Sequence, residues 1–302
     1  MRIRAVAIFA VLLLALLWTA CGRDDPDGDA TSVRAPPGSL AQARTGHTST
    51  ILPDDSVLVV GGVGPNLAVL ASTEVYDPST GGWIAGAILT QARVDHTATA
   101  MKDGRVLIVG GFQRGRGALS SAQMFDPSAR EWSNTASMAR ARVAHSATLL
   151  NDGRVLIVGG TQLGRPSAEI YDGEDNAWAR TIMEAQVDES HTATLMDDGR
   201  VLVVGFDRAR EAAQVQIFDP SVDTWSIAGS PVTLLGAFHS ASLLPDGRVL
   251  LSGGLGPGLQ LLASSEVYDP RSDSWSPGAA MGDSRGGHSA TLLPDGRVLV
   301  AG

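Results

Sequence analysis

A unit of about fifty residues recurs along this chain, and the recurrence constrains the fold more than any other feature of the sequence. Each copy opens with a histidine, and all six histidines are used in this way: His47, His96, His145, His191, His239 and His288. Their successive spacings are 49, 49, 46, 48 and 49 residues. A period of this length indicates a solenoid or a propeller, in which each unit buries its apolar surface against the next.

Distances inside the unit vary less than the period itself. A glycine follows each histidine by 14 residues, and in the five complete units an aromatic residue lies seven residues before a tryptophan. The tryptophans are Trp83, Trp132, Trp178, Trp225 and Trp275. Nearly all variation in length falls between the glycine and the aromatic residue. This pattern predicts a loop of variable length at that point.

Each unit is predicted to contain four short strands. In the third unit, residues 145–150 are small or apolar, and residues 154–158 form the continuous β-branched run of a strand buried on both faces. Asp152 and Gly153 suit a tight hairpin between them. Tyr171 and Trp178 mark the third and fourth strands. The first strands carry small side chains and the fourth strands carry bulky ones, as expected of sheets whose first strands converge on a common axis. We therefore predict an all-β propeller of four-stranded blades whose first strands line a central channel.

The double glycine after the second strand, the aromatic residue of the third and the tryptophan seven residues later resemble the kelch repeat. The form His-x-Ala-Thr-Leu-Leu-x-Asp-Gly-Arg-Val-Leu is similar to bacterial kelch proteins and to the propeller of galactose-oxidase-like proteins. The resemblance implies a kelch β-propeller over residues 39–302, with five complete units and a truncated sixth. The fourth unit departs from the pattern at Asp188 and Phe206. Because the last unit stops before its third strand, we expect the chain to be a fragment of a longer protein.

The N-terminal residues have the features of an export signal. Residues 1–20 have a basic start and an apolar run that is short for a membrane span. Residues 17–22 resemble the lipobox of bacterial lipoproteins, in which the cysteine, here Cys21, is acylated; ordinary cleavage after Gly22 is the alternative. Residues 21–38 then form the lipidated cysteine and a flexible acidic tether. We expect a lipoprotein of the cell envelope, in the outer membrane or at the cell surface, in preference to a secreted soluble protein.

Charge and cysteine content narrow the classes of function. The formal net charge of −9 disfavours a nucleic-acid partner. Galactose oxidase works with copper and a tyrosine cross-linked to cysteine, but Cys21 is the only cysteine here, so those copper ligands cannot be carried over. No nucleophile elbow and no P-loop occurs in the sequence. We therefore predict no catalytic residue and no cofactor.

Several polar residues repeat with the blades. One interpretation of six histidines near a common axis is a set of ligands that surrounds a metal ion. A residue present in every unit is more simply explained as serving the blade, through a hydrogen bond to the backbone of a neighbouring blade, so we predict no metal site. An arginine three residues before the histidine and an acid of the third strand also recur, and we expect them to pair: Arg44, Arg93, Arg142 and Arg285 with Glu74, Glu169 and Glu266.

Residues that differ between units are better candidates for binding. The loops after the second strands and the segments entering the first strands are predicted to share one face of the propeller. The candidates on the loops are Asn66, Gln113, Arg114, Arg116, Arg165, Arg208, Arg210 and Gln260. The arginines predict a basic rim for an acidic protein or glycan surface. We therefore expect a non-catalytic protein- or carbohydrate-binding module. Two alternatives stay open: the propeller of a carbohydrate-active enzyme whose catalytic residues lie outside this chain, and a purely structural envelope protein.

Overall fold

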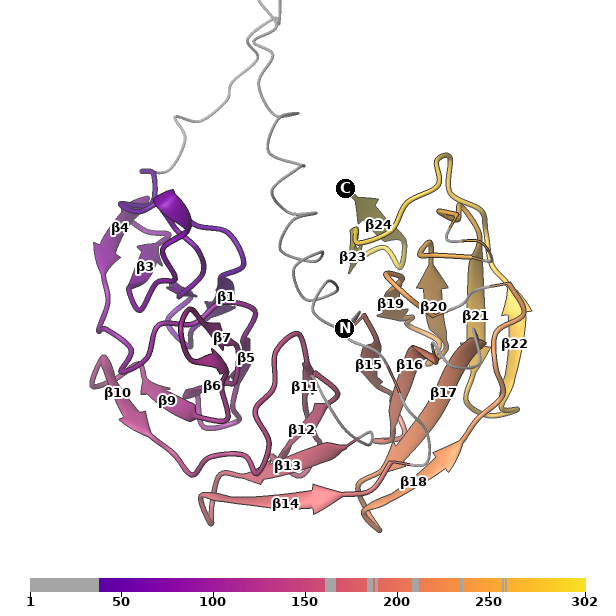
Figure 1. Ribbon diagram of the computed structural model, residues 1–302. Coiled ribbons are helices and arrows are strands. Elements are labelled where there is room, and N and C mark those ends of the chain that lie inside the picture. The colour runs from indigo at the N-terminus through magenta and orange to yellow at the C-terminus, as the bar shows by residue number, and fades with distance from the viewer. Residues whose placement is uncertain are drawn as a thin grey trace, which may run out of the picture. The chain divides into compact units, whose positions relative to one another are not determined.

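Antiparallel four-stranded sheets follow one another along the chain as the blades of a propeller (Figure 1). The structure is a computed structural model that describes residues 38–160, 167–183, 187, 190–207, 212–233, 236–256, 258 and 260–302. The predicted export signal, Cys21 and the tether up to residue 37 lie outside the described residues. The propeller unit is Gly38–Gly302. No helix among the described residues has the length and apolar character needed to cross a membrane.

Blades 1 to 3 each contain four strands. Blade 1 consists of β1 (Thr48–Ile51), β2 (Val57–Val60), β3 (Thr73–Asp77) and β4 (Gly82–Ala85). Blade 2 consists of β5 (Thr97–Ala100), β6 (Val106–Val109), β9 (Ala122–Asp126) and β10 (Glu131–Asn134). Blade 3 consists of β11 (Ser146–Leu149), β12 (Val155–Val158), β13 (Ala168–Asp172) and β14 (Ala177–Thr181).

Blades 4 and 5 repeat this plan, and a strand pair follows them. Blade 4 consists of β15 (Thr192–Leu195), β16 (Val201–Asp207), β17 (Ala212–Asp219) and β18 (Thr224–Ile227). Blade 5 consists of β19 (Ser240–Leu243), β20 (Val249–Ser252), β21 (Ser265–Asp269) and β22 (Ser274–Pro277). The last pair is β23 (Ser289–Leu292) and β24 (Val298–Ala301). The all-β prediction of four-stranded blades is confirmed, with five complete units and two strands of a sixth.

The first strands of successive blades adjoin one another, in the order β1, β5, β11, β15, β19 and β23. They form the inner side of the arc in Figure 1, and the fourth strands form its outer side. Small residues on the first strands permit this close approach. Large residues on the fourth strands fill the wider space between diverging blades.

The hydrophobic core lies between blades. Leu58 and Val60 of β2 pack with Val106 and Ile108 of β6 in one cluster, and three further clusters join the later blade pairs in the same way. The second strands are buried because a blade covers each side, which explains their continuous apolar sequence. A blade alone could not exclude water from these residues, so the stability of each blade depends on its neighbours.

The aromatic residue and the tryptophan seven residues later face each other across the third and fourth strands. Tyr171 lies directly opposite Trp178 in the register of β13 and β14, and their ring centroids are 5.0 Å apart. The Trp178 indole nitrogen also donates a hydrogen bond to the Ala136 carbonyl, which belongs to the segment that leaves blade 2. The tryptophan therefore joins its own blade to the preceding one.

The double glycines are required by close contacts between blades. Gly110 has a φ of +61°, and a Cβ placed on it would lie 2.7 Å from the Arg142 carbonyl oxygen and 2.8 Å from Cε1 of His145. Both of those residues belong to the next unit. Positive φ and the absence of space therefore both favour glycine at this position.

Candidate binding face

The loop after the second strand and the segment entering the first strand meet on one face of each blade. In blade 1, Val63 of the loop pairs with Thr45 of the entering segment, and in blade 2 Phe112 pairs with Val94. The expected placement of these two kinds of connection on one face is confirmed by this backbone pairing. We call this surface the loop face. The turns between first and second strands and between third and fourth strands lie on the other face, where Arg154 bonds Asp223 and the Pro220 carbonyl of the next blade.

Three of the predicted binding residues share one hairpin of the loop face. Strands β7 (Phe112–Gln113) and β8 (Gly117–Ala118) form this hairpin, with Arg114 and Arg116 exposed at its tip. The Gln113 side-chain oxygen, by contrast, is buried and has no hydrogen-bond partner among the described residues.

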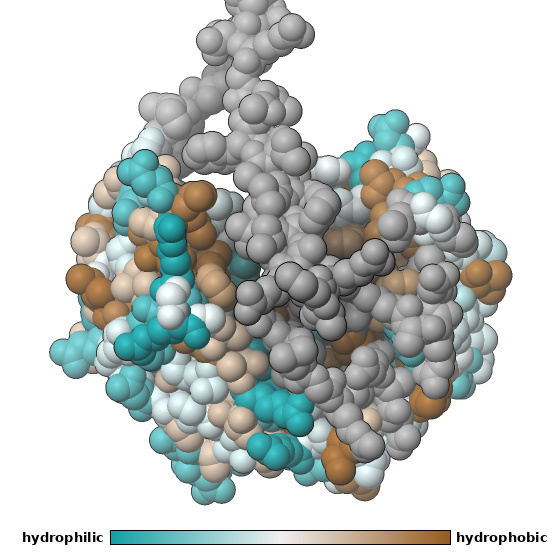
Figure 2. Space-filling model, viewed as in Figure 1, coloured by the Kyte–Doolittle hydropathy of each residue, from teal (hydrophilic) through white to brown (hydrophobic). Residues whose placement is uncertain are grey.

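The other predicted residues stand on separate blades. Asn66 is exposed in the short 3-10 helix η2 (Pro65–Leu67) of blade 1, and Gln260 is exposed in the loop of blade 5. Arg165, Arg208 and Arg210 lie outside the described residues. Figure 2 shows one side of the molecule, where hydrophilic and hydrophobic areas lie side by side over the blades.

In five of the six units, the residue directly before the histidine belongs to an inner ring on the loop face. The Asp95 amide donates to the Gly46 carbonyl of the preceding unit, and the Asp95 carbonyl accepts from the Ala144 amide of the next. The Gly287 amide likewise donates to the Phe238 carbonyl. All five residues have positive φ, between 53° and 71°. Because these bonds join first strands that adjoin one another, the inner ring lies where the blades come closest together.

Two members of the inner ring carry larger side chains than glycine or alanine, and our sequence reasoning missed both. Asp95 is half-buried, and Phe238 is 51% exposed although a bulky residue seldom adopts a φ of +57°. A signal was present in the sequence. The equivalent positions in the first, third and last units are Gly46, Ala144 and Gly287, so Asp95 and Phe238 break a pattern of small residues.

The histidines join neighbouring blades. His96 Nε2 lies 2.9 Å from the Thr48 hydroxyl of blade 1, and His145 Nε2 lies 2.9 Å from the Thr97 hydroxyl of blade 2. Equivalent bonds of 2.8 to 2.9 Å run from Ser146 to His191, from Thr192 to His239 and from Ser240 to His288. The expected link between blades exists, and at Nε2 its partner is a hydroxyl of the preceding first strand in place of the expected backbone group. The serine and threonine residues of the first strands thus serve as hydrogen-bond partners of the histidines in the next blade.

Burial keeps the central histidines neutral. Loss of hydration, with a smaller contribution from the nearby arginine, lowers the pKa of His96 and of His145 to about 3. Loss of hydration also lowers the pKa of His239 to about 4. Among the described residues, no group of three or more His, Cys, Asp or Glu side chains is arranged to hold a metal ion. These histidines therefore act as neutral hydrogen-bonding groups between blades.

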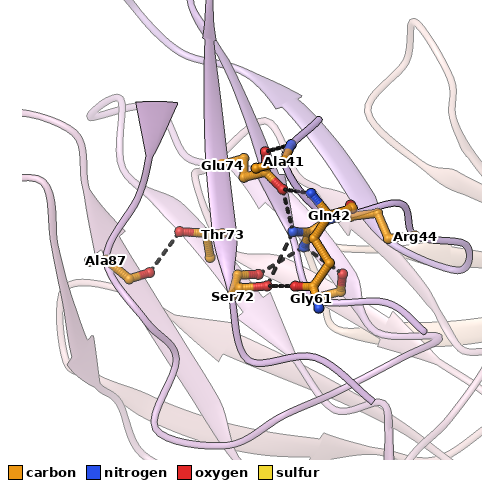
Figure 3. A network of polar contacts seen from close by, with 8 residues as sticks. All are labelled: Ala41, Gln42, Arg44, Gly61, Ser72, Thr73, Glu74 and Ala87. Carbon is orange, nitrogen blue, oxygen red and sulfur yellow. Dashed lines mark hydrogen bonds and ion pairs between the residues drawn. The ribbon is translucent and has the colours of Figure 1, made fainter. Parts of the chain in front are cut away.

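Arginine and glutamate pair within two of the blades, as expected. In blade 1, Arg44 contacts Glu74 at 2.6 Å and donates to the carbonyl oxygens of Gly61 and Ser72 (Figure 3). Glu74 also accepts hydrogen bonds from the amides of Ala41 and Gln42. Arg142 and Glu169 repeat the pair in blade 3 at 3.0 Å. This network fastens the entering segment to the loop and therefore fixes the backbone of the loop face.

Blade 2 has the arginine without the acid. Arg93 is fully buried and donates to the carbonyl oxygens of Gly110 and Ser121, but Gln123 occupies the position of the glutamate. The Gln123 side-chain oxygen is buried without a partner among the described residues. Burial lowers the pKa of Arg93 to about 10. The expected pairing of arginine with an acid therefore does not extend to Arg93, because blade 2 lacks the acid.

Comparison with known proteins agrees with the geometry of the blades. Residues 46–254 match the KLHDC2/KLHL20/DRC7 Kelch-repeats domain family. Kelch-like protein 21 of Danio rerio is 37% identical over 71 residues, which are 24% of this chain and 11% of that protein. The match thus spans about a tenth of the relative's length, and it concerns the repeats.

We expect reciprocal effects from exchanging glutamate and glutamine between blades 2 and 3. Glu169→Gln leaves the buried Arg142 without a carboxylate and should lower the free energy of unfolding by about 3 kcal/mol. Gln123→Glu gives Arg93 a carboxylate and should raise that free energy by about 1–2 kcal/mol. Urea denaturation of the two single variants measures both changes. Equal stability of wild type and Glu169→Gln would show that the pair of Arg142 and Glu169 contributes nothing to the free energy of unfolding.

The buried histidines predict a loss of stability in mild acid. In the unfolded chain each histidine binds a proton near pH 6.5, whereas in the fold the pKa of His96, His145 and His239 is about 3 to 4. The free energy of unfolding should therefore fall as the pH falls below 6.5, with each histidine contributing up to about 1.4 kcal/mol per pH unit. Urea denaturation between pH 7 and about pH 5 avoids most carboxylate titration.

Substitution of one histidine tests this assignment. His145→Gln removes one titrating group, so its stability should depend less steeply on pH than that of wild type. His288→Gln is the matched control, since the partly exposed His288 has a smaller burial effect on its pKa. The same pH slope in wild type and His145→Gln would contradict the prediction.

Proposed function

Because the chain belongs to the kelch-repeat family, we propose that its propeller is a non-catalytic binding module that recognises an acidic segment of a protein partner on the loop face. The observation that carries the proposal is the contrast between two sets of arginines. The repeated arginines Arg44, Arg93 and Arg142 are buried and bonded within their blades. Arg114 and Arg116, which do not repeat, are exposed on the β7–β8 hairpin.

The chemistry of guanidinium groups supports an acidic ligand. Guanidinium groups bind carboxylates through paired, charge-assisted hydrogen bonds, and arginine is enriched among the residues that dominate protein interfaces. Neither Arg114 nor Arg116 forms a side-chain hydrogen bond or ion pair with another described residue. Their donors are available to a partner. Arg165, Arg208 and Arg210, predicted for the same face, would extend the basic rim.

The alternative of a carbohydrate-active enzyme rests on residues beyond this chain. The three tyrosines stand at the repeated aromatic position, where each lies about 5 Å from the tryptophan of its blade. They support blade packing, and none offers a copper ligand on the loop face. An acidic glycan remains the second candidate ligand, because sulfate and carboxylate groups would suit the same arginines.

We also propose that Cys21 is acylated and that the propeller is exported and held at a membrane of the cell envelope by this anchor and its acidic tether. The apolar run followed directly by a single cysteine supports this proposal. Several acyl chains on one residue suffice for stable anchoring.

Acylation predicts a membrane-bound protein whose attachment depends on one thiol. In cells of the source grown with an alkyne-tagged fatty acid, the wild-type chain should carry the tag and sediment with membranes, because its anchor is buried in the bilayer. Cys21→Ser should lose both properties. A wild-type protein that carries no tag would contradict the proposal and favour ordinary signal cleavage.

Binding is tested with peptides selected on the purified protein from a random library displayed on phage. The selected peptides should be rich in Asp and Glu, and their Kd, measured by fluorescence anisotropy, should rise about tenfold or more in Arg114→Ala/Arg116→Ala. The melting temperature should not change, because neither side chain is packed. Lys102→Ala/Arg297→Ala is the control, since it removes the same charge from turns on the opposite face.

Two results would count against this function. An unchanged Kd in the hairpin variant would remove Arg114 and Arg116 from the site. Binding to acidic glycans on an array, with no peptide selected, would replace the protein partner by the carbohydrate alternative.

A further inference from the structure

The inner ring of the loop face holds one carboxylate in a fixed position. The Asp95 backbone is bonded on both sides, by its amide to Gly46 and by its carbonyl to Ala144. Its φ of +53° lies in the left-handed region, which aspartate adopts more readily than most residues that carry a side chain. The two backbone bonds therefore fix the point from which the Asp95 carboxylate extends.

The Asp95 carboxylate has no partner among the described residues. No hydrogen bond or ion pair to its side-chain oxygens is formed, although the side chain is half-buried. Loss of hydration raises the pKa of the Asp95 carboxyl, and no neighbouring charge contributes to that shift. Retaining a carboxylate in such a place costs stability, because burial penalises an unpaired charge.

The cationic groups on neighbouring segments are already engaged elsewhere. Arg44 of blade 1 is paired with Glu74, and Arg93 of blade 2 is buried among carbonyl groups. The adjoining His47 and His96 have lowered pKa values and are neutral at pH 7. No cation of the described residues therefore balances the negative charge of Asp95.

The residues on either side of Asp95 in the inner ring are small. One carboxylate oxygen of Asp95 lies over Gly46, so close that a Cβ on Gly46 would be 3.2 Å from it. On the other side the inner ring continues with the small residue Ala144. Gly46 thus provides the room that the Asp95 side chain occupies, and small residues flank it on both sides.

We propose that Asp95 binds a lysine or arginine side chain of the partner, at the inner ring of the loop face. This inference rests on the proposed function and specifies its ligand. Arg114 and Arg116 stand on the loop of the same blade, so the partner segment would combine a cationic side chain for Asp95 with acidic residues for the hairpin. A cation would provide the charge partner that Asp95 lacks among the described residues, and such a contact is strengthened by partial exclusion of water.

A single carboxylate favours an organic cation over a metal ion. Ca²⁺ and Mg²⁺ require several oxygen ligands, and no described cluster of acidic or histidine side chains surrounds Asp95. An ammonium or guanidinium group brings its own donors and requires only one charged acceptor.

The test is a double-mutant cycle between Asp95 and a cationic residue of a selected peptide. The probes are a lysine-containing peptide obtained by phage selection on wild type and its analogue with norleucine in place of lysine. Asp95→Asn is nearly isosteric, and asparagine tolerates positive φ as aspartate does. Asp55→Asn is the matched control, because Asp55 also has positive φ, at 64°, but belongs to a turn on the opposite face.

The expected result is coupling between the two changes. The lysine peptide should bind Asp95→Asn about tenfold more weakly than wild type, whereas the norleucine peptide should bind both proteins equally. Asp55→Asn should behave as wild type with both peptides. Asp95→Asn should also have a higher melting temperature than wild type at pH 7, because it removes a buried unpaired charge.

Two outcomes would overturn the inference. The absence of lysine and arginine from the selected peptides would exclude a cationic ligand. Equal losses with the lysine and norleucine peptides would show that Asp95 acts on the fold and not on the cation. In either case, peptides that still depend on Arg114 and Arg116 would leave the proposed function standing, whereas peptides independent of both arginines would remove it.

Discussion

Packing between neighbouring blades is the interaction on which the rest of this structure depends. The second strands are apolar on both faces and cannot be kept from water by one sheet, so Leu58 of blade 1 requires Ile108 of blade 2. The polar groups follow the same rule. His96 bonds the Thr48 hydroxyl of the preceding blade, and Trp178 bonds the Ala136 carbonyl that leaves it. Apolar burial supplies the attraction, and these bonds fix the position of one blade on the next.

The buried ion pairs show how a repeat can vary without losing its fold. Blades 1 and 3 join arginine to glutamate, blade 2 retains Arg93 without the acid, and blade 5 retains Glu266 where Gly236 replaces the arginine. In blade 5 the amides of Val232 and Thr233 bond the glutamate. The backbone therefore binds the charged residue that each of these blades retains: carbonyl groups accept from Arg93 in blade 2, and amides of the entering segment donate to Glu266 in blade 5.

Function, by contrast, is best sought where equivalent positions differ. The inner ring consists of backbone bonds that impose positive φ, and glycine or alanine satisfies this geometry in three units. Asp95 and Phe238 adopt the same positive φ with side chains that the backbone bonds of the ring do not require. The exposed arginines of the β7–β8 hairpin are also specific to one blade. A regular scaffold thus carries a small set of irregular residues, and these are the ones for which we propose a role in binding.

The sequence by itself determined the architecture, because the fifty-residue period, the Asp-Gly turns and the seven-residue spacing from Tyr171 to Trp178 depend on local chemistry repeated in every unit. It also indicated the loop face, since strands that alternate in direction place alternate connections together. The tertiary structure decided which polar groups meet. The Thr48 hydroxyl and His96 are 48 residues apart, so their contact depends on how two blades pack. The isolation of the Asp95 carboxylate is likewise a property of its surroundings. Gly46 comes from another blade, and Arg93, only two residues away, is turned to the Gly110 and Ser121 carbonyl groups.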